Sequence, residues 1–416
     1  MSGIKRLRRI QLYKEATATK GTIGLPTAVL RATGTVEDQR VMHFPPEDIG
    51  YLVDVERVSI PYKSAVLEIE ENPATFEQLP YYFSGGILLH NTAVADGGTG
   101  DIYTYPFSYQ EPVNDFQTFA IEAGDNEEME IIPYGFVRSF KISGRPKMPL
   151  MISATIEGRQ AERLKLAIAD AVFAHGPPET ITPTVAGQFA GANNFPNGSN
   201  IRIEGATLAA NNGLKTVVTC TDDVLTVTET LADQAAEAVT IQQDFTDSAA
   251  LPNVEDILFS KTELFIDPDT GAFGGNAMNS ILMGFDMEVE TGIQARPAAS
   301  GQLYFPRAAL VNPSIRLRMT LEWDGNSSDE KQLWKDGGHA GRLVRMRTRG
   351  SELETAGAYT YKELQMDVAG QWEKFEKLGE DNGNDIIDCL LRGQYNTTEA
   401  KYATFIVVAD SLPTLP

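Results

Sequence analysis

The chain has few of the residues that most metal-binding and redox sites use. Its 416 residues include only two cysteines and four histidines, which are Cys220, Cys389, His43, His90, His175 and His339. No histidine lies within metal-ligand spacing of another histidine or of a cysteine, so no zinc site is expected. The two cysteines lie far apart in strand-like runs. This favours buried, unpaired thiols and folding in a reducing cytoplasm.

Long apolar runs and catalytic motifs are missing as well. No apolar stretch reaches 18 residues, so we expect no transmembrane helix and no membrane contact. Residues 1–14 are basic, but no apolar run of signal-peptide length follows them, so we expect no secretory signal. The patterns G-x-S-x-G, H-E-x-x-H and G-x-x-x-x-G-K-[ST] do not occur. We therefore predict that the protein is not an enzyme, with no catalytic, cofactor-binding or metal-binding residues and no cofactor.

Basic residues are outnumbered by acidic ones. Lysine and arginine total 35 against 57 aspartates and glutamates, which gives a formal net charge of −22. Such a charge disfavours non-specific binding to nucleic acid or to an anionic membrane. The hydrophobic content of 42% is sufficient for globular folding, and the length predicts two or three domains.

Alternation of apolar and polar residues dominates the pattern that is present. It predicts strands in antiparallel sheets that have one solvated face. The clearest alternating runs are residues 65–70, 136–142, 150–156, 281–289, 315–323 and 344–348. The sequence therefore predicts a mainly β fold.

Three segments have helical features. Residues 74–86 and 327–338 each lie between strand-like runs and end at two glycines, and Thr75 is expected to cap the first of these helices. A third helix is expected over residues 159–176, which end at a glycine. Its apolar residues recur at helical spacing, namely Leu164, Ile168, Ala171 and Val172.

Composition and repetition divide the chain into three predicted domains. Residues 177–253 are poor in lysine and arginine and contain short β runs, so we expect a small inserted β domain there. The flanking domains, 1–176 and 254–416, share the order strand, helix, Gly-Gly, which predicts an internal duplication. Each half is expected to close on a strand pair. The expected pairs are residues 135–146 with 149–158, and residues 385–395 with 402–410.

Three charged segments have both a structural and a functional interpretation. "DPDTG", residues 267–271, favours a β-turn with Pro at its second position over a calcium loop. "GEDNGND", residues 379–385, favours a hairpin tip with an Asn-Gly turn over a cation site. An arginine row could bind phosphates, but in so acidic a chain we expect these arginines to pair with acids. The row consists of Arg342, Arg345, Arg347 and Arg349.

The order of several segments resembles a known family, the major tail tube proteins of long-tailed, noncontractile bacteriophages. The segments are "RRIQLYKEATATKGT", "HFPPEDIGYLV", "ATFEQLPYYFSGGI", "FAIEAGD" and "PYGFVRSFKISG". The likeness covers about the first 160 residues and returns more faintly from about 254 to 416. The resemblance implies two tandem antiparallel β-sandwich domains, each with a short flanking helix, and an inserted all-β domain. It further implies stacked rings, and two domains per chain would need three copies for pseudo-sixfold symmetry.

The resemblance also implies partners and a location. The protein would be a structural component of the virion tail, made in the host cytoplasm. Its partners would be its own copies, a tape measure protein, and tail terminator or tip proteins. Viral DNA would pass through the lumen without specific binding. We expect the inserted domain on the outside, and subunit contacts from residues 1–14 and a loop over about 19–50.

Charge gives a further expectation about the lumen. The lumen should be net negative, because each cation lining it would bind a passing phosphate. Polar strand faces such as residues 286–290 should face inward, and Arg345, Arg347 and Arg349 should be neutralised by acids.

Two other classes of function remain open at this level. A surface adhesin whose β domains bind a receptor would suit the charge and the β content. A glycan-active enzyme is a more distant alternative, with separate acids such as Asp101 and Glu111 as candidates.

Overall fold

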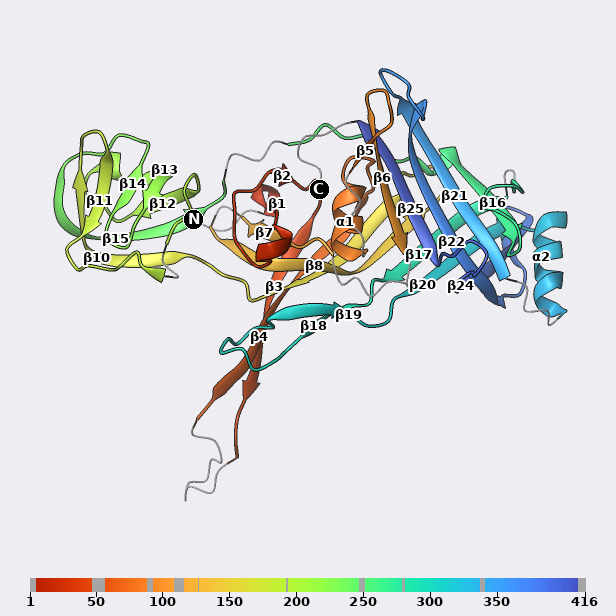
Figure 1. Cartoon of the computed structure of the whole chain (residues 1–416), viewed down its shortest axis with the longest axis horizontal. Helices are drawn as coiled ribbons and strands as arrows, with labels where there is room; N and C mark the ends of the chain where they lie inside the picture. The colour runs from red at the N-terminus through yellow and green to blue at the C-terminus, as the bar shows by residue number, and fades with distance from the viewer. Residues whose placement is uncertain are drawn as a thin grey trace.

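The computed structural model describes residues 5–46, 57–87, 93–107, 116–125, 127–191, 194–246, 251–278, 281–336 and 341–410. The protein is mainly β, as the alternating patterns predict. It is elongated, with a small barrel at one end, a short helix at the other and a two-stranded arm projecting between them (Figure 1). His90, His339, Glu111 and the Gly337-Gly338 pair lie outside the described residues.

The strands fall into three groups along the chain. The first group comprises β1 (Arg9–Lys14), β2 (Ala28–Val29), β3 (Gly34–His43), β4 (Ser59–Pro73), β5 (Val94–Ala95), β6 (Gly100–Phe107), β7 (Phe119–Gly124), β8 (Met129–Gly144) and β9 (Met151–Gly158). The barrel comprises β10 (Lys165–Ala174), β11 (Glu179–Pro183), β12 (Asn200–Glu204), β13 (Gly213–Cys220), β14 (Leu225–Val227) and β15 (Gln234–Asp244). The last group comprises β16 (Thr262–Pro268), β17 (Leu282–Glu290), β18 (Ile293–Arg296), β19 (Arg307–Leu310), β20 (Ser314–Glu322), β21 (Gly341–Glu352), β22 (Tyr361–Phe375), β23 (Gly379–Asp381), β24 (Asn384–Gly393) and β25 (Ala403–Asp410).

One continuous antiparallel sheet runs through both halves of the chain. Its hydrogen-bonded order is β3-β4-β9-β8-β17-β20-β24-β22, and we call it the eight-stranded sheet. A second layer contains β2-β1-β7 beside the first half of β8, and β16-β21-β22-β25-β6 farther along. Apolar side chains of the two layers form one large buried cluster. The long strands β8 and β22 each take part in both layers.

The helix α1 (Leu79–Gly86) is confirmed within the predicted segment, but its predicted cap is wrong. All eight of its residues are buried, so it belongs to the core. It begins at Leu79 with Pro80 in its first turn, where a missing backbone N–H costs nothing. The Thr75 hydroxyl has no hydrogen-bond partner within the described part of the chain. A residue four positions before the helix cannot serve as its N-cap.

The helix α2 (Gly325–Lys335) also matches its predicted segment, but it lies at the surface. Asp324 caps it through a reciprocal hydrogen-bond pair with Ser327. Its buried residues are Ser327 and Glu330, and the Glu330 carboxylate accepts hydrogen bonds from Arg342 Nε at 2.7 Å and from Trp372 Nε1 at 2.8 Å.

The third predicted helix, over residues 159–176, is wrong. This segment contains β10, which pairs with β11 and β15 in the barrel. Register shifts interrupt the β10–β15 pairing between Ile168 and Ala171 and again before Phe173. The first shift places the buried residues Ile168 and Ala171 three apart, which is the spacing of neighbours on one helix face. The barrel therefore includes residues that the sequence analysis assigned to the first domain.

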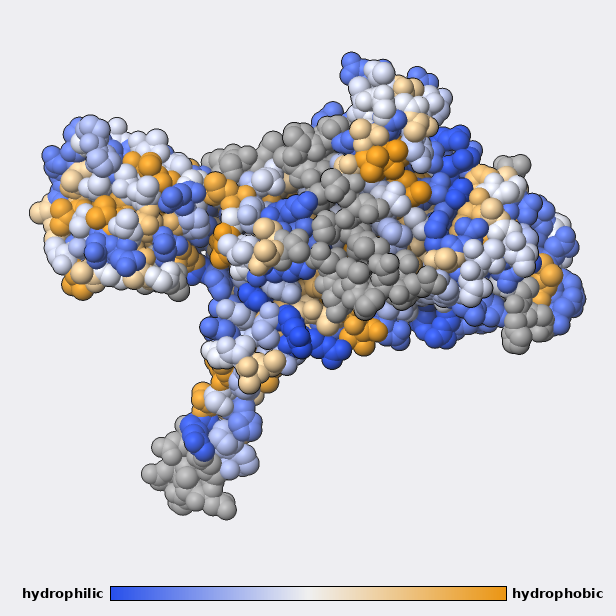
Figure 2. All heavy atoms as spheres, in the orientation of Figure 1, coloured by the Kyte–Doolittle hydropathy of each residue, from blue (hydrophilic) through white to orange (hydrophobic). Residues whose placement is uncertain are grey.

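The expected contact loop over about residues 19–50 is also partly wrong, because it contains β3. This strand pairs with β4 to form the arm that projects from the body (Figure 1). No side chain of β3 is fully buried, and only Gly34, Val36 and Asp38, on one face, are partly buried, so its sequence shows little apolar periodicity. Apolar side chains at Val41, Met42 and Val58 are more than half exposed. Figure 2 shows apolar atoms scattered among polar ones along the arm.

The two acidic turn segments are turns in the structure. Asn382 and Gly383 connect β23 to β24 and have φ angles of 51° and 88°, so the predicted Asn-Gly hairpin tip is confirmed. In "DPDTG" the Gly271 N–H donates to the Pro268 oxygen at 3.0 Å. The turn therefore starts at Pro268, and Pro occupies its first position rather than its second.

Candidate assembly surface

The eight-stranded sheet repeats a unit of four strands. In the first half the unit is β3-β4-β9-β8, and in the second half it is β17-β20-β24-β22. Each helix follows the second strand of its unit, since α1 comes after β4 and α2 comes after β20. Each helix also contacts the fourth strand of its unit, β8 for α1 and β22 for α2. The two helices thus occupy equivalent places in the sheet topology.

The hairpins β8–β9 and β22–β24 match residue by residue. Both contain a bulge at the same point, between Val137 and Ser139 in β8 and between Trp372 and Lys374 in β22. The turns contain residues with positive φ at equivalent positions, Lys147 and Asn382. Identical residues occupy equivalent positions, namely Gly135 and Gly370, Phe140 and Phe375, Gly144 and Gly379, Ile152 and Ile387, and Gly158 and Gly393.

The expected partners in this repeat were partly wrong. The sequence analysis matched residues 135–158 with residues 385–410, which contain β24 and β25. In the structure β24 and β25 each pair with β22, and β22–β24 is the hairpin equivalent to β8–β9. The hairpin β22–β24 was missed because the alternating run of β22 was not recognised as the counterpart of β8.

The two units join through β8 and β17. The second half of β8 pairs antiparallel with β17, from Gly144 opposite Phe285 to Ser139 opposite Glu290. In this way the last strand of the first unit binds the first strand of the second unit. The joint buries backbone groups that would otherwise form an open sheet edge.

Within the described residues, equivalent strand edges are unpaired at the two ends of the eight-stranded sheet. At one end, β3 pairs with β4 on one side, and no described residue pairs with its other side. At the other end, β21 pairs with β22 as far as Gly341 opposite Gln371, and no described residue pairs with this edge of β22 beyond Gln371. The open part of β22 corresponds to the part of β8 that binds β17. In the described structure, β8 and β17 thus form one strand pairing between the two units. The unpaired edges of β22 and β3 are equivalent to the two sides of that pairing.

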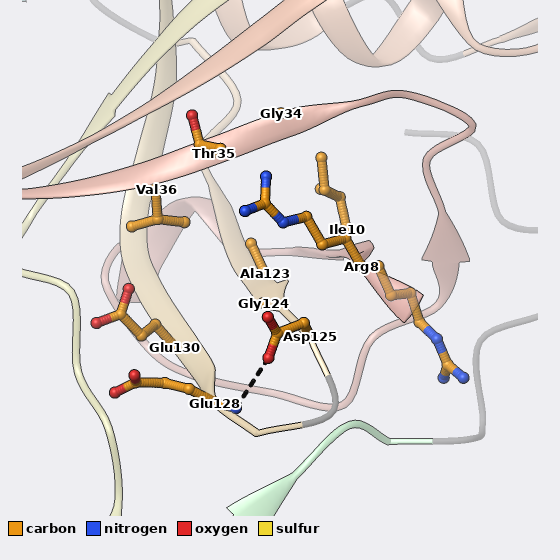
Figure 3. A pocket seen from close by; sticks show the side chains of 11 residues that line it. Arg8, Ile10, Gly34, Thr35, Val36, Ala123, Gly124, Asp125, Glu128 and Glu130 are labelled. Carbon is orange, nitrogen blue, oxygen red and sulfur yellow. Dashed lines mark hydrogen bonds between the residues drawn. The ribbon is translucent and has the colours of Figure 1, made fainter. Parts of the chain in front are cut away.

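A charged pocket lies beside the open edge of β3 (Figure 3). Gly34, Thr35 and Val36 of β3 line one side, and Glu128 and Glu130 lie on the other. Burial raises the pKa of Glu130, and the nearby carboxylates Glu128 and Asp38 raise it further. Arg8 and Arg9 also line the pocket, so it is a recess with charges of both signs beside β3.

The arginine row on β21 is paired with acids, as predicted. Arg345 makes a two-pronged contact with Asp367, through Nε at 2.7 Å and a terminal nitrogen at 2.8 Å. The other partners are Glu330 for Arg342, Glu263 for Arg347, and Glu363 for Arg349. These arginines stabilise the second layer and are not free to bind phosphate.

The N-terminal segment is part of the fold rather than a free arm. Ile10 and Leu12 of β1 are buried, and the strand pairs with β7. The Arg9 guanidinium lies 5.3 Å from the centre of the Phe245 ring, at the exit from the barrel. The expected subunit contacts of residues 1–14 remain a prediction, and a truncation that tests them must spare β1.

Glu122 of β7 joins the barrel to the body. Its carboxylate accepts hydrogen bonds from the backbone N–H and the hydroxyl of Thr246, at 3.3 and 3.2 Å. Gln11, opposite Glu122 on β1, donates to the Thr246 oxygen at 2.9 Å. Burial raises the pKa of Glu122 to about 7, although Thr246 and Arg9 oppose the shift.

Among the described residues no group of three or more potential ligands could hold a metal ion. The Asp267 carboxylate accepts hydrogen bonds from the backbone N–H groups of Gly274, Gly275 and Asn276, so it closes a loop.

Both cysteines are unpaired; Cys389 is buried, but Cys220 is only half-buried. His43 is exposed at the end of β3, and His175 lies 3.0 Å from Glu179. Neither helix in the described part of the chain is long and apolar enough to cross a membrane.

Comparison of the chain with protein-family models and with curated proteins finds no match.

Proposed function

We propose that the protein is a structural subunit that assembles with its own copies into closed rings, and that these rings stack into a tail tube of a long-tailed bacteriophage. Three copies would complete a ring. DNA would pass through the lumen, and tape measure and terminator or tip proteins would contact the tube. The resemblance of the N-terminal segments supports the family, and the repeated four-strand unit supports the assembly.

The observation that carries the proposal is the filled joint between β8 and β17. The edge of β22 that no described residue pairs with is equivalent to the edge of β8 in this joint, and the unpaired edge of β3 is equivalent to the edge of β17. A joint of this type between chains would continue the eight-stranded sheet from one copy to the next. A ring closes all edges, which removes the aggregation hazard of an open strand. Three eight-stranded sheets also exceed the size at which a barrel leaves only a modest water channel.

The internal joint supplies a register for the joint between copies. Ser139 is opposite Glu290 in the internal joint. By the residue equivalences of the repeat, Lys374 of one copy would lie opposite Gln39 of the next. Lys374 would then sit diagonally across from Glu37, a favourable cross-strand pair.

The polar face of the eight-stranded sheet would line the channel. Asp286, Glu288 and Glu290 alternate along β17 on this face. Their cross-strand neighbours include Lys141 of β8 and Arg316 of β20, so the face contains both charge signs. An overall negative lining remains a prediction.

Electron microscopy of the purified protein tests the proposal most directly. Rings or tubes seen in negative stain would support it. Single particles that stay monomeric at high concentration would contradict it and favour the surface adhesin.

Disulfide cross-linking tests the proposed register. A Gln39→Cys and Lys374→Cys double variant in a Cys220→Ser background should form chain-to-chain disulfides under mild oxidation. The cross-linked ladder should end at the size of one ring. A matched variant that combines Gln39→Cys with Lys335→Cys, on the exposed helix α2, should not cross-link. Equal cross-linking of both variants would exclude the register.

A further inference from the structure

Three arginines on the polar face of the eight-stranded sheet form a cationic patch. Arg316 and Arg318 lie two residues apart on β20, and Arg392 of β24 lies directly opposite Arg316. All three side chains are exposed. Like charges directly opposite each other destabilise a sheet, so this pairing needs an explanation.

Carboxylates near the patch do not neutralise it. Within the described residues none of the three arginines makes an ion pair or a side-chain hydrogen bond. Asp286, opposite Arg318, is bound by Lys141 and Arg145 instead. Glu288 is opposite Arg316 but makes no ion pair with it among the described residues.

The remaining acids at the edge of the patch are also engaged. The Asp388 carboxylate accepts a hydrogen bond from the Thr320 hydroxyl at 2.6 Å. Glu376 contacts Lys374 at 3.0 Å, and the charge of Arg318, without an ion pair, also lowers the pKa of this carboxyl. The arginines of β21, by contrast, all have acidic partners. In a chain with a net charge of −22, these three guanidinium groups on one face have no ion pair with any described residue.

We propose that Arg316, Arg318 and Arg392 form a binding site for phosphate groups, and that its ligand is the backbone of duplex nucleic acid. A phosphate between Arg316 and Arg392 would convert their mutual repulsion into attraction on both sides. Guanidinium groups donate paired hydrogen bonds that match the oxygens of a phosphate. The binding of an anion follows from the patch alone, whereas the choice of nucleic acid rests on the proposed function.

The site changes the expected behaviour of the channel. A uniformly acidic wall would only repel the duplex. Patches repeated once per copy around a ring would instead hold it weakly at fixed points, while the acids of β17 repel it between them. The contact would weaken as salt rises, because phosphate binding releases counterions.

Arginine modification with phenylglyoxal, mapped by mass spectrometry, tests the site in the intact protein. Arg347 and Arg349 of β21, whose partners are Glu263 and Glu363, supply a control pair of acid-paired arginines in the same molecule. Inorganic pyrophosphate or a short DNA duplex should slow modification of Arg316 and Arg392 several-fold relative to chloride at equal ionic strength. Modification of the control pair should not change.

The outcomes separate the possibilities. Equal protection of both pairs, or of neither, would overturn the site. Protection by pyrophosphate but not by the duplex would overturn the assignment to nucleic acid. An Arg316→Gln, Arg392→Gln variant should also lose the rise in thermal midpoint that pyrophosphate gives the unmodified protein, and an Arg347→Gln, Arg349→Gln variant should keep it. A chain that is monomeric by microscopy but still shows selective protection would contradict the proposed function and leave the anion site standing.

Discussion

Glu122 illustrates at the scale of one residue how a buried carboxyl can connect two parts of a protein. Its side chain is 3% exposed, and it holds the chain where β15 leaves the barrel. The Oε1 atom of Gln11, opposite Glu122 on β1, is buried without a partner among the described residues. A protonated carboxyl, but not a carboxylate, can donate a hydrogen bond to such an acceptor.

The raised pKa predicts how stability depends on pH. Since burial shifts the pKa of Glu122 from 4.5 to about 7, the folded state binds the proton more tightly than the unfolded state. Stability should therefore fall as pH rises from about 4.5 to 7. A Glu122→Gln variant cannot ionise, so at pH 8 it should be more stable than the unmodified protein, by at most about 3 kcal/mol.

Urea denaturation at pH 4.5 and pH 8 measures this effect. The advantage of the Glu122→Gln variant should be present at pH 8 and largely absent at pH 4.5. Glu354→Gln, at an exposed position between β21 and β22, provides the matched control for the loss of a surface carboxylate. A stability difference that is the same at both pH values would contradict the assignment.

At the scale of elements, the two matched hairpins depend on glycine where backbones approach closely. A Cβ atom on Gly370 would lie 2.5 Å from the Arg392 oxygen, and one on Gly135 would lie 2.9 Å from the Phe119 oxygen. These contacts involve backbone, so the strands cannot make room without moving. Both glycines lie just before the bulge where the strand passes from one layer to the other.

We predict that Gly370→Ala destabilises the protein by about 1 to 3 kcal/mol, as expected for overpacking. Thermal or urea denaturation measures the change. Gly325→Ala is the control, because a Cβ there meets nothing within 4 Å and the residue lies in the first turn of α2. If the two variants lost stability equally, the close approach at Gly370 would not be the cause.

At the scale of the whole molecule, the barrel has the features of a domain that can be removed without unfolding the rest. It closes on itself through six strands and has its own apolar cluster, which includes Phe173, Phe189 and Ile241. It forms a distinct lobe at one end of the molecule (Figures 1 and 2). The chain enters and leaves it at adjacent points, since Gln243 N–H donates to the Leu164 oxygen at 2.8 Å.

We therefore predict that replacing residues 165–246 by a short Gly-Ser linker preserves ring formation. The deletion removes the Glu122–Thr246 contact, so Glu122→Gln should accompany it to avoid an unpaired buried charge. Negative-stain microscopy of the shortened protein measures the outcome. A folded shortened chain that no longer assembles would show that the barrel contributes to the joint between copies, against its expected place on the outside.

The sequence alone determined the features that depend on local pattern. Alternation gave the strands that contain Leu67, Ile142, Met287 and Leu317, because side chains alternate across a pleated strand whatever its partners are. Asn382-Gly383 gave a hairpin turn, because these residues tolerate positive φ. The excess of acids also indicated that the arginines of β21 would be paired.

Tertiary structure decided everything that depends on which strands become neighbours. The bulges of β10 made a strand resemble a helix, and the exposure of β3 concealed a strand that has no buried face. The equivalence of β22 with β8, the filled joint with β17 and the facing of Arg316 with Arg392 all arise from pairing between residues far apart in sequence. No local pattern encodes which strand pairs with which. The alternation of apolar and polar residues in one strand is compatible with any neighbouring strand that keeps its apolar face buried.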